Sequence, residues 1–206
     1  MSNSNSRRVY ISADYDPYYG DREVVDELIS WSVDARRKVD FVDMAKVVSG
    51  TVANDPDCRI CDLKEEFNRQ INASSSVIIV VGDRTALRTA GEACQRTQEG
   101  LLRYTCTPYR QNANGQKPCK VSCVHRADPQ GDVGPINSYS YLRHEYEQAK
   151  RKNKQIVVLY NSTRREASWL PSYLMGLEDS ARPFWVKNDW GERVGDYDHI
   201  KEVLGF

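Results

Sequence analysis

The sequence predicts an α/β fold: a flavodoxin-like, open parallel five-stranded sheet with helices on both faces. Three observations support this fold class. Short apolar runs alternate with segments of helical periodicity, which favours a parallel sheet with right-handed crossovers. The run at 77–82 is continuously apolar, as in a strand buried on both faces. The length of 206 residues suits one domain, so we expect a disordered tail over 1–8 and a single domain over 9–206.

The elements before this run are placed by the spacing of their apolar residues. Strands one and two are predicted at 8–12 and 39–43, where short apolar runs end in polar residues. Helices are predicted at 23–38 and 63–72, where apolar residues recur every three or four positions. Residues 44–57 are polar and contain glycine and proline, which favours a long loop.

After strand three the periodicity fades, and Gly, Gln, Asn, Pro and Cys become frequent. We interpret 88–137 as a cysteine-containing insertion on the surface of the domain. Beyond it, a helix is predicted at 138–153, a strand at 155–160, a fifth strand at 183–187 and a short helix at 197–204.

The helix predicted at 138–153 separates two carboxylates. Its apolar stripe is formed by Leu142, Tyr146 and Ala149. At about 100° per residue, Glu145 lies at the edge of this stripe, whereas Glu147 falls on the opposite, solvent-facing side. A carboxylate where a helix meets a sheet is costly unless it is paired or used. Glu145 is therefore either a rim residue paired with a cation such as Arg143, or a functional group.

In the strand order 2-1-3-4-5, ligands bind beyond the carboxyl ends of strands one and three, where the winding direction reverses. Those ends lie at 12–16 and 82–85, and the helix that bears Glu145 begins beside the same crevice. Three separate segments are thus expected to converge on one site. The alternative is that both strand ends are ordinary turns.

The segments at this crevice resemble a known family. Residues 9–12 read Val-Tyr-Ile-Ser, 71–85 read Ile-Asn-Ala-Ser-Ser-Ser-Val-Ile-Ile-Val-Val-Gly-Asp-Arg-Thr, and 141–149 read Tyr-Leu-Arg-His-Glu-Tyr-Glu-Gln-Ala. In this order they resemble a TIR domain, in particular the TIR-like proteins of bacterial Thoeris antiphage defence. The resemblance covers 8–87 and 138–206 and leaves the insertion unexplained.

The resemblance implies an NAD glycohydrolase or ADP-ribosyl cyclase-like transferase. NAD is then the substrate, and the product is a cyclic or conjugated ADP-ribose signal that reaches a separate downstream effector by diffusion. In this family an aromatic residue and a glutamate four residues later open the helix after strand three. Here these are Tyr141, where tryptophan is usual, and Glu145, which is carried over as catalytic. A homo-oligomer and a phage protein as trigger are further expectations.

Cleavage between nicotinamide and ribose develops oxocarbenium character, which a carboxylate stabilises more in the transition state than in the ground state. Nicotinamide leaves neutral, so no general acid is required. No Gly-x-Gly-x-x-Gly fingerprint supports a Rossmann-type dinucleotide site. The residues expected to contact the substrate are Ser12, Ala13, Asp14, Asp83, Thr85 and Tyr141.

The six cysteines leave two interpretations open. Cys58 and Cys61 form a CxxC pair, and Cys119 and Cys123 form a CxxxC pair with His125 close behind. Together they supply enough ligands for a structural zinc site. The alternative is free thiols in a reducing cytosol.

Composition excludes some partners. The formal net charge is zero, which does not favour nucleic acid or an anionic membrane. No apolar run approaches the roughly 20 residues that span a bilayer, and the N-terminus lacks an apolar signal core. We therefore expect a cytoplasmic protein.

Three other functions remain as alternatives. A phospho-acceptor receiver domain shares the fold, and its site is imitated by Asp14, Asp16, Asp83, Ser162 and Lys187. A non-catalytic TIR scaffold would not need Glu145. A nucleoside deoxyribosyltransferase would also use a glutamate, but it would exchange bases on deoxynucleosides and ignore NAD.

Overall fold

A computed structural model describes most of the chain outside the predicted insertion. The described residues are 7–16, 18–34, 37, 39–51, 59–88, 110–112, 115–117 and 140–205. Most of the predicted tail and insertion lies outside these residues. Cys58, Cys119 and Cys123 also lie outside them. The zinc site therefore stays a prediction.

Five parallel strands form one sheet in the order β2-β1-β3-β6-β7, which confirms the predicted order 2-1-3-4-5. The strands are β1 (Arg7–Ser12), β2 (Val39–Val42), β3 (Ser76–Val81), β6 (Gln155–Tyr160) and β7 (Arg182–Pro183). Every residue of the central strand β3 is buried, as its continuous apolar sequence predicts.

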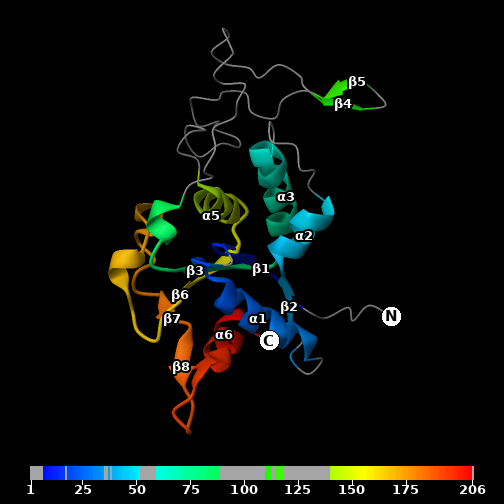
Figure 1. Cartoon of the computed structure of the whole chain (residues 1–206). Helices are drawn as coiled ribbons and strands as arrows, with labels where there is room; N and C mark the ends of the chain where they lie inside the picture. The colour runs from blue at the N-terminus through cyan, green and yellow to red at the C-terminus, as the bar shows by residue number, and fades with distance from the viewer. Residues whose placement is uncertain are drawn as a thin grey trace.

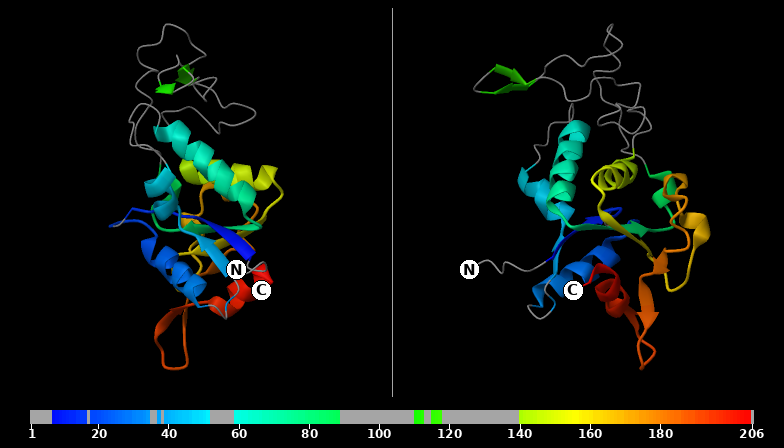
Figure 2. Two further views of the ribbon diagram at one scale, coloured as in Figure 1. Left: turned by 90° about the vertical axis from the view of Figure 1, so that its right-hand side faces the viewer. Right: turned by 180° about the vertical axis from the view of Figure 1, so that it is seen from behind.

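Helices cover both faces of this sheet (Figures 1 and 2). On one face lie α1 (Arg22–Val33) and α6 (Tyr197–Leu204); on the other lie α2 (Met44–Thr51), α3 (Arg59–Ala73) and α5 (Tyr141–Arg151). Alternate residues of β1 serve the two cores: Val9 and Ile11 pack with α1 and α6, whereas Tyr10 packs with the other three helices. The side chain of Tyr10 is thereby directed toward α5.

The prediction of a loop at 44–57 is wrong for its first part, because helix α2 occupies Met44–Thr51. Asp43 stabilises the start of this helix: its carboxylate accepts a hydrogen bond from the backbone N–H of Ala45 at 3.0 Å. Met44 is buried against the sheet. This short helix supplies one wall of the site described below.

The prediction of a fifth sheet strand at 183–187 is wrong beyond Pro183. The sheet strand β7 ends at Pro183, and β8 (Trp185–Lys187) pairs instead with antiparallel β9 (Arg193–Gly195). The side chain of Asn188 closes this hairpin by accepting the backbone N–H groups of Trp190 and Glu192. A local turn therefore takes the chain away from the sheet edge.

Smaller differences concern the ends of elements. Helix α1 ends at Val33 rather than near 38, and α5 begins at Tyr141, with the side chain of Ser140 accepting the N–H of Arg143 at 3.3 Å. The remaining elements are the hairpin β4 (Arg110–Asn112) and β5 (Gly115–Lys117) and the 3-10 turns Thr85–Leu87, Ala167–Trp169 and Ser172–Leu174. Among the described helices, none is both long enough and apolar enough to cross a bilayer.

Candidate functional site

A pocket of about 300 Å³ lies beyond the carboxyl end of β1, between the loop that follows β1 and helices α2, α3 and α5. Its apolar wall includes Met44, Val48, Leu63, Phe67 and Leu142. Its polar groups come from Asp14, Arg88 and Glu145. A concave apolar site with a few converging polar groups is typical of small-molecule binding, and this volume is at the lower end of the usual range.

Glu145 is the buried carboxyl group of this pocket. Its side chain projects from α5, and the residue is only 5% exposed. Burial raises the pKa of Glu145 to about 8, and the nearby hydroxyls of Ser12 and Tyr10 offset only part of this rise. By strict hydrogen-bond geometry, its Oε2 and the hydroxyls of Ser12 and Tyr10 have no partner among the described residues, although both hydroxyls lie close enough to the carboxyl group to lower its pKa. Unsatisfied buried polar atoms are uncommon and require an explanation.

The charge state of Glu145 depends on what enters the pocket. With a pKa of about 8, the side chain is mostly protonated at neutral pH in the empty pocket. A cationic group brought against it would favour the carboxylate and lower its pKa. The site is therefore electrostatically suited to a ligand that carries or develops positive charge.

Tyr141 lies one turn before Glu145 and forms part of the pocket wall. Its ring packs edge-to-face against Phe67, with 5.5 Å between ring centroids. Ala13 and Asp14 also line the pocket, whereas Ser12 is fully buried beside Glu145. The structure thus brings together four of the predicted substrate-binding residues around Glu145.

Asp83 and Thr85 are placed differently from these four. Neither is among the residues that line the pocket. Asp83 is exposed, and the buried hydroxyl of Thr85 accepts the backbone N–H of Gly82 at 2.8 Å, which stabilises the turn after β3. Their contact with a substrate stays a prediction.

Arg88 is a site residue that the sequence did not reveal. It forms an ion pair with Asp14 and a second one, at 3.3 Å, with Asp16. The pKa of Asp16 is lowered, chiefly by the backbone N–H groups of Tyr18 and Tyr19 and to a smaller extent by Arg88. Because Arg88 stands at the edge of the predicted insertion, nothing in its sequence neighbourhood indicated that it would join the loop after β1.

Asp21 is a second buried carboxyl group at the same edge of the sheet. It is 3% exposed, and burial raises its pKa to about 6. Its Oδ1 accepts a hydrogen bond from Asn161 at 3.0 Å, and a Cβ on Gly82 would lie only 2.3 Å from the same oxygen. The backbone N–H of Asp21 also donates to Asp14 at 2.7 Å, so Asp21 positions the pocket loop.

The residues that imitate a receiver site are dispersed. Asp14 and Asp16 are both engaged by Arg88, and Lys187 lies on β8 and lines a different pocket. Within the described ranges, no group of three or more His, Cys, Asp or Glu is arranged to hold a metal ion. The ion pairs of Arg88 with Asp14 and Asp16 and the separate position of Lys187 do not favour the receiver interpretation.

The chain matches no protein-family model and no curated protein. A solved structure to which it is similar is the crystal structure of a prokaryotic SEFIR domain, with 12% sequence identity and a TM-score of 0.45. The superposition covers 97% of this chain and 94% of that chain. At this identity and TM-score the likeness adds nothing to the assignment of the site, which depends on the geometry above.

Proposed function

We propose that the chain is a TIR-like enzyme that cleaves NAD at the Glu145 pocket, releases nicotinamide and makes an ADP-ribose-derived signalling nucleotide, cyclic or conjugated, in antiphage defence. The observation that supports this most directly is the buried carboxyl group of Glu145, with its raised pKa, at the wall of a pocket beyond β1. A buried carboxyl group with a perturbed pKa that lines a cleft is a candidate for a functional site.

The charge of the substrate suits this carboxyl group. The nicotinamide ring of NAD carries a formal positive charge, which favours the ionised form of Glu145 when the ring enters the pocket. As the bond between nicotinamide nitrogen and ribose C1′ breaks, its electron pair stays on nitrogen and nicotinamide leaves neutral. The positive charge passes to the ribose, where the carboxylate of Glu145 stabilises it.

The second half of the reaction needs a nucleophile at C1′. A water oxygen would give ADP-ribose, whereas a nucleophilic atom of the same or another nucleotide would give a cyclic or conjugated product. A hydroxyl or water that attacks loses its proton, and the carboxylate of Glu145 can accept it. Apolar residues such as Met44, Leu63 and Leu142 restrict water around this position, which favours transfer over hydrolysis.

The size of the pocket suggests how the rest of NAD is held. A volume of about 300 Å³ suits the nicotinamide and its ribose better than a whole dinucleotide. The remaining half must then lie outside the pocket, where a second copy of the chain would supply contacts. A homo-oligomer, a phage protein as trigger and an effector reached by a diffusible nucleotide are parts of this proposal.

Incubation of the purified protein with NAD tests the proposal, with nicotinamide measured by chromatography and the nucleotide products by mass. The parent should release nicotinamide, and Glu145→Gln should not. Glu147→Gln is the matched control, because it removes a carboxylate from the same helix at a position that does not line the pocket.

Three outcomes would contradict the assignment. An equally active Glu145→Gln protein would remove the proposed role of this residue. A parent protein that leaves NAD intact but exchanges bases on deoxynucleosides would instead identify a deoxyribosyltransferase. A parent that does neither, but binds TIR domains, would indicate a scaffold.

A further inference from the structure

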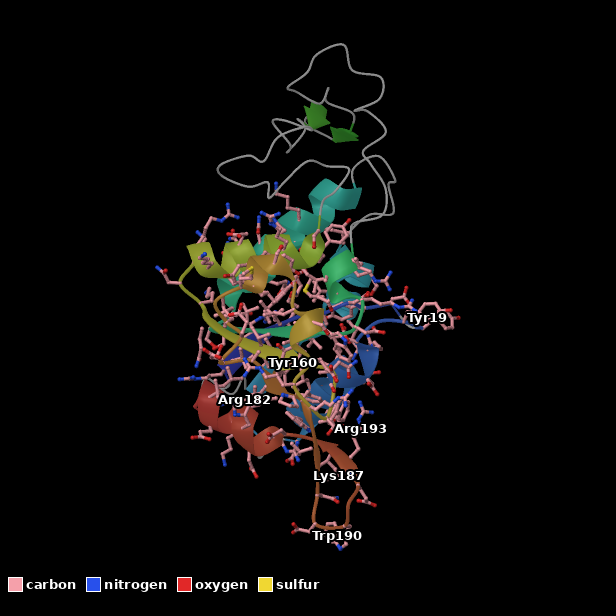
Figure 3. All side chains as sticks on the ribbon, turned by 90° about the vertical axis from the view of Figure 1, so that its left-hand side faces the viewer. Tyr19, Tyr160, Arg182, Lys187, Trp190 and Arg193 are labelled. Atoms are coloured by element: carbon pink, nitrogen blue, oxygen red, sulfur yellow. The ribbon has the colours of Figure 1, made fainter. Side chains whose placement is uncertain are left out.

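A second pocket, of about 530 Å³, lies where the end of β6, strands β7 and β8, and helix α6 meet. It shares no lining residue with the Glu145 pocket. The polar side chains that line it belong to Thr163, Arg182, Lys187, Asp196 and His199. Figure 3 shows Arg182 and Lys187 on the same side of the molecule, above the hairpin tip at Trp190.

Arg182 and Lys187 are exposed cations without a side-chain partner among the described residues. Several arginines of the described structure are ion-paired, as in Arg22–Asp26, Arg69–Glu66, Arg88–Asp14, Arg164–Glu166 and Arg193–Glu23. Within the same residues, Arg182 and Lys187 form neither an ion pair nor a side-chain hydrogen bond. They therefore place two uncompensated positive charges beside one cavity.

Asp196 does not neutralise the two cations. It is the single acidic residue among those that line the pocket, and its carboxylate caps α6 by accepting the backbone N–H of His199 at 3.1 Å. Two full positive charges therefore face one negative charge that already has a hydrogen bond. The imidazole of His199 and the hydroxyl of Thr163 add hydrogen-bonding groups to the pocket.

The apolar wall of the pocket is held in place. The indole of Trp185 donates a hydrogen bond to Asn161 at 2.8 Å, and the guanidinium of Arg193 lies over its ring at 3.9 Å from the centroid. Pro183 and Val186 complete this wall. The cavity is thus preformed, with cations beside a rigid apolar surface.

We propose that this pocket binds the di- or triphosphate group of a nucleotide, with Arg182 and Lys187 contacting phosphoryl oxygens. Guanidinium and ammonium groups both recognise phosphate, the former through paired donors and the latter as a point charge. The volume is within the range of small-molecule sites, and the apolar wall suits the nucleoside part. The proposal does not depend on NAD cleavage, because the two pockets are separate.

Calorimetric titration of the full chain in metal-free, low-salt buffer tests this site with three probes: ATP, pyrophosphate and adenosine. ATP and pyrophosphate should bind, more weakly as salt is added, and adenosine should not. The double variant Arg182→Ala/Lys187→Ala should lower the affinity for both phosphate probes at least about tenfold. Glu145→Gln should bind them like the parent, which separates this test from that of the catalytic proposal.

The matched control is Lys152→Ala/Lys201→Ala, which likewise removes two positive charges from exposed positions, but from positions that do not line the pocket. Tighter binding of ATP than of pyrophosphate would assign the natural ligand to nucleotides, and equal binding would assign it to the phosphate group alone. The proposal is overturned if the parent binds neither phosphate probe at millimolar concentration, if adenosine binds as tightly as ATP, or if both double variants lose affinity equally. Should the alanine variant unfold, Arg182→Gln/Lys187→Gln repeats the test.

Discussion

Glu145 and Asp21 are two buried carboxyl groups at the same edge of the sheet, and burial raises the pKa of both, to about 8 and about 6. Their surroundings differ. Each has one oxygen without a hydrogen-bond partner among the described residues, but Asp21 also accepts a hydrogen bond from Asn161 and is packed against Gly82, whereas Glu145 borders a pocket. Burial and an unpartnered oxygen therefore do not identify a functional carboxyl group by themselves; the adjacent pocket distinguishes Glu145.

The largest expected effect is on NAD cleavage. Glu145→Gln should lower the rate of nicotinamide release roughly 100-fold or more, because it removes a preorganised group that stabilises transition-state charge. Asp21→Asn should retain most of the activity at neutral pH, because Asp21 acts only by holding the loop. Initial rates of nicotinamide release at saturating NAD measure both effects. If both variants lose the same activity, Glu145 and Asp21 do not differ in function.

The next effect is on the pH dependence of stability. Folded Glu145 keeps its proton between pH 4.5, its ordinary pKa, and about 8, while the unfolded chain has released it. The free energy of unfolding therefore falls as pH rises through this window, on the order of a few kcal/mol. Glu145→Gln should lack this fall. The difference between its free energy of unfolding and that of the parent should therefore grow in favour of the variant from pH 5 to pH 9.

Urea unfolding at pH 5, 7 and 9 measures this difference. For Asp21→Asn the corresponding window runs from pH 3.8 to about pH 6. The stability that this variant gains over the parent should therefore reach its full value near neutral pH. Parallel stability curves for the parent and Glu145→Gln would show that Glu145 is hydrated rather than buried.

Asn161→Ala should destabilise the fold by about 1–3 kcal/mol, because it leaves a buried carboxyl oxygen without its donor. The same change removes the acceptor of the Trp185 indole N–H. Thermal unfolding at neutral pH measures the loss, and Asn188→Ala, at the exposed hairpin turn, is a control of the same chemistry. If both variants lose equal stability, the hydrogen bond from Asn161 to the Asp21 carboxylate does not stabilise the fold.

The smallest effect is expected for Tyr10→Phe. The Tyr10 hydroxyl lowers the pKa of Glu145, so its removal should raise that pKa and move the rising limb of kcat/KM to higher pH. A shift of half a unit would cost about threefold in kcat/KM at pH 7. An unchanged pH profile would mean that this hydroxyl does not act on Glu145.

The position of Glu145 where its helix meets the sheet could be predicted because it depends on local geometry, whereas its catalytic role stays a prediction. Its position relative to Leu142, Tyr146 and Ala149 follows from the angle per residue of one helix, and all three are buried as expected. Arg88, Asp21 and Asn161 could not be found in this way. The hydrogen bond between Asp21 and Asn161 joins residues 140 positions apart, and no periodicity relates them.

The sequence by itself determined the alternation of strands and helices, the central buried strand and the helix that bears Glu145, since each depends on the spacing of neighbouring residues. Three features came from tertiary packing alone: α2 closes the pocket, the fifth strand stops at Pro183, and Asp21 meets Asn161 while Glu145 borders the pocket. The physical reason is that pKa, burial and hydrogen bonding depend on groups that meet only after distant segments pack together.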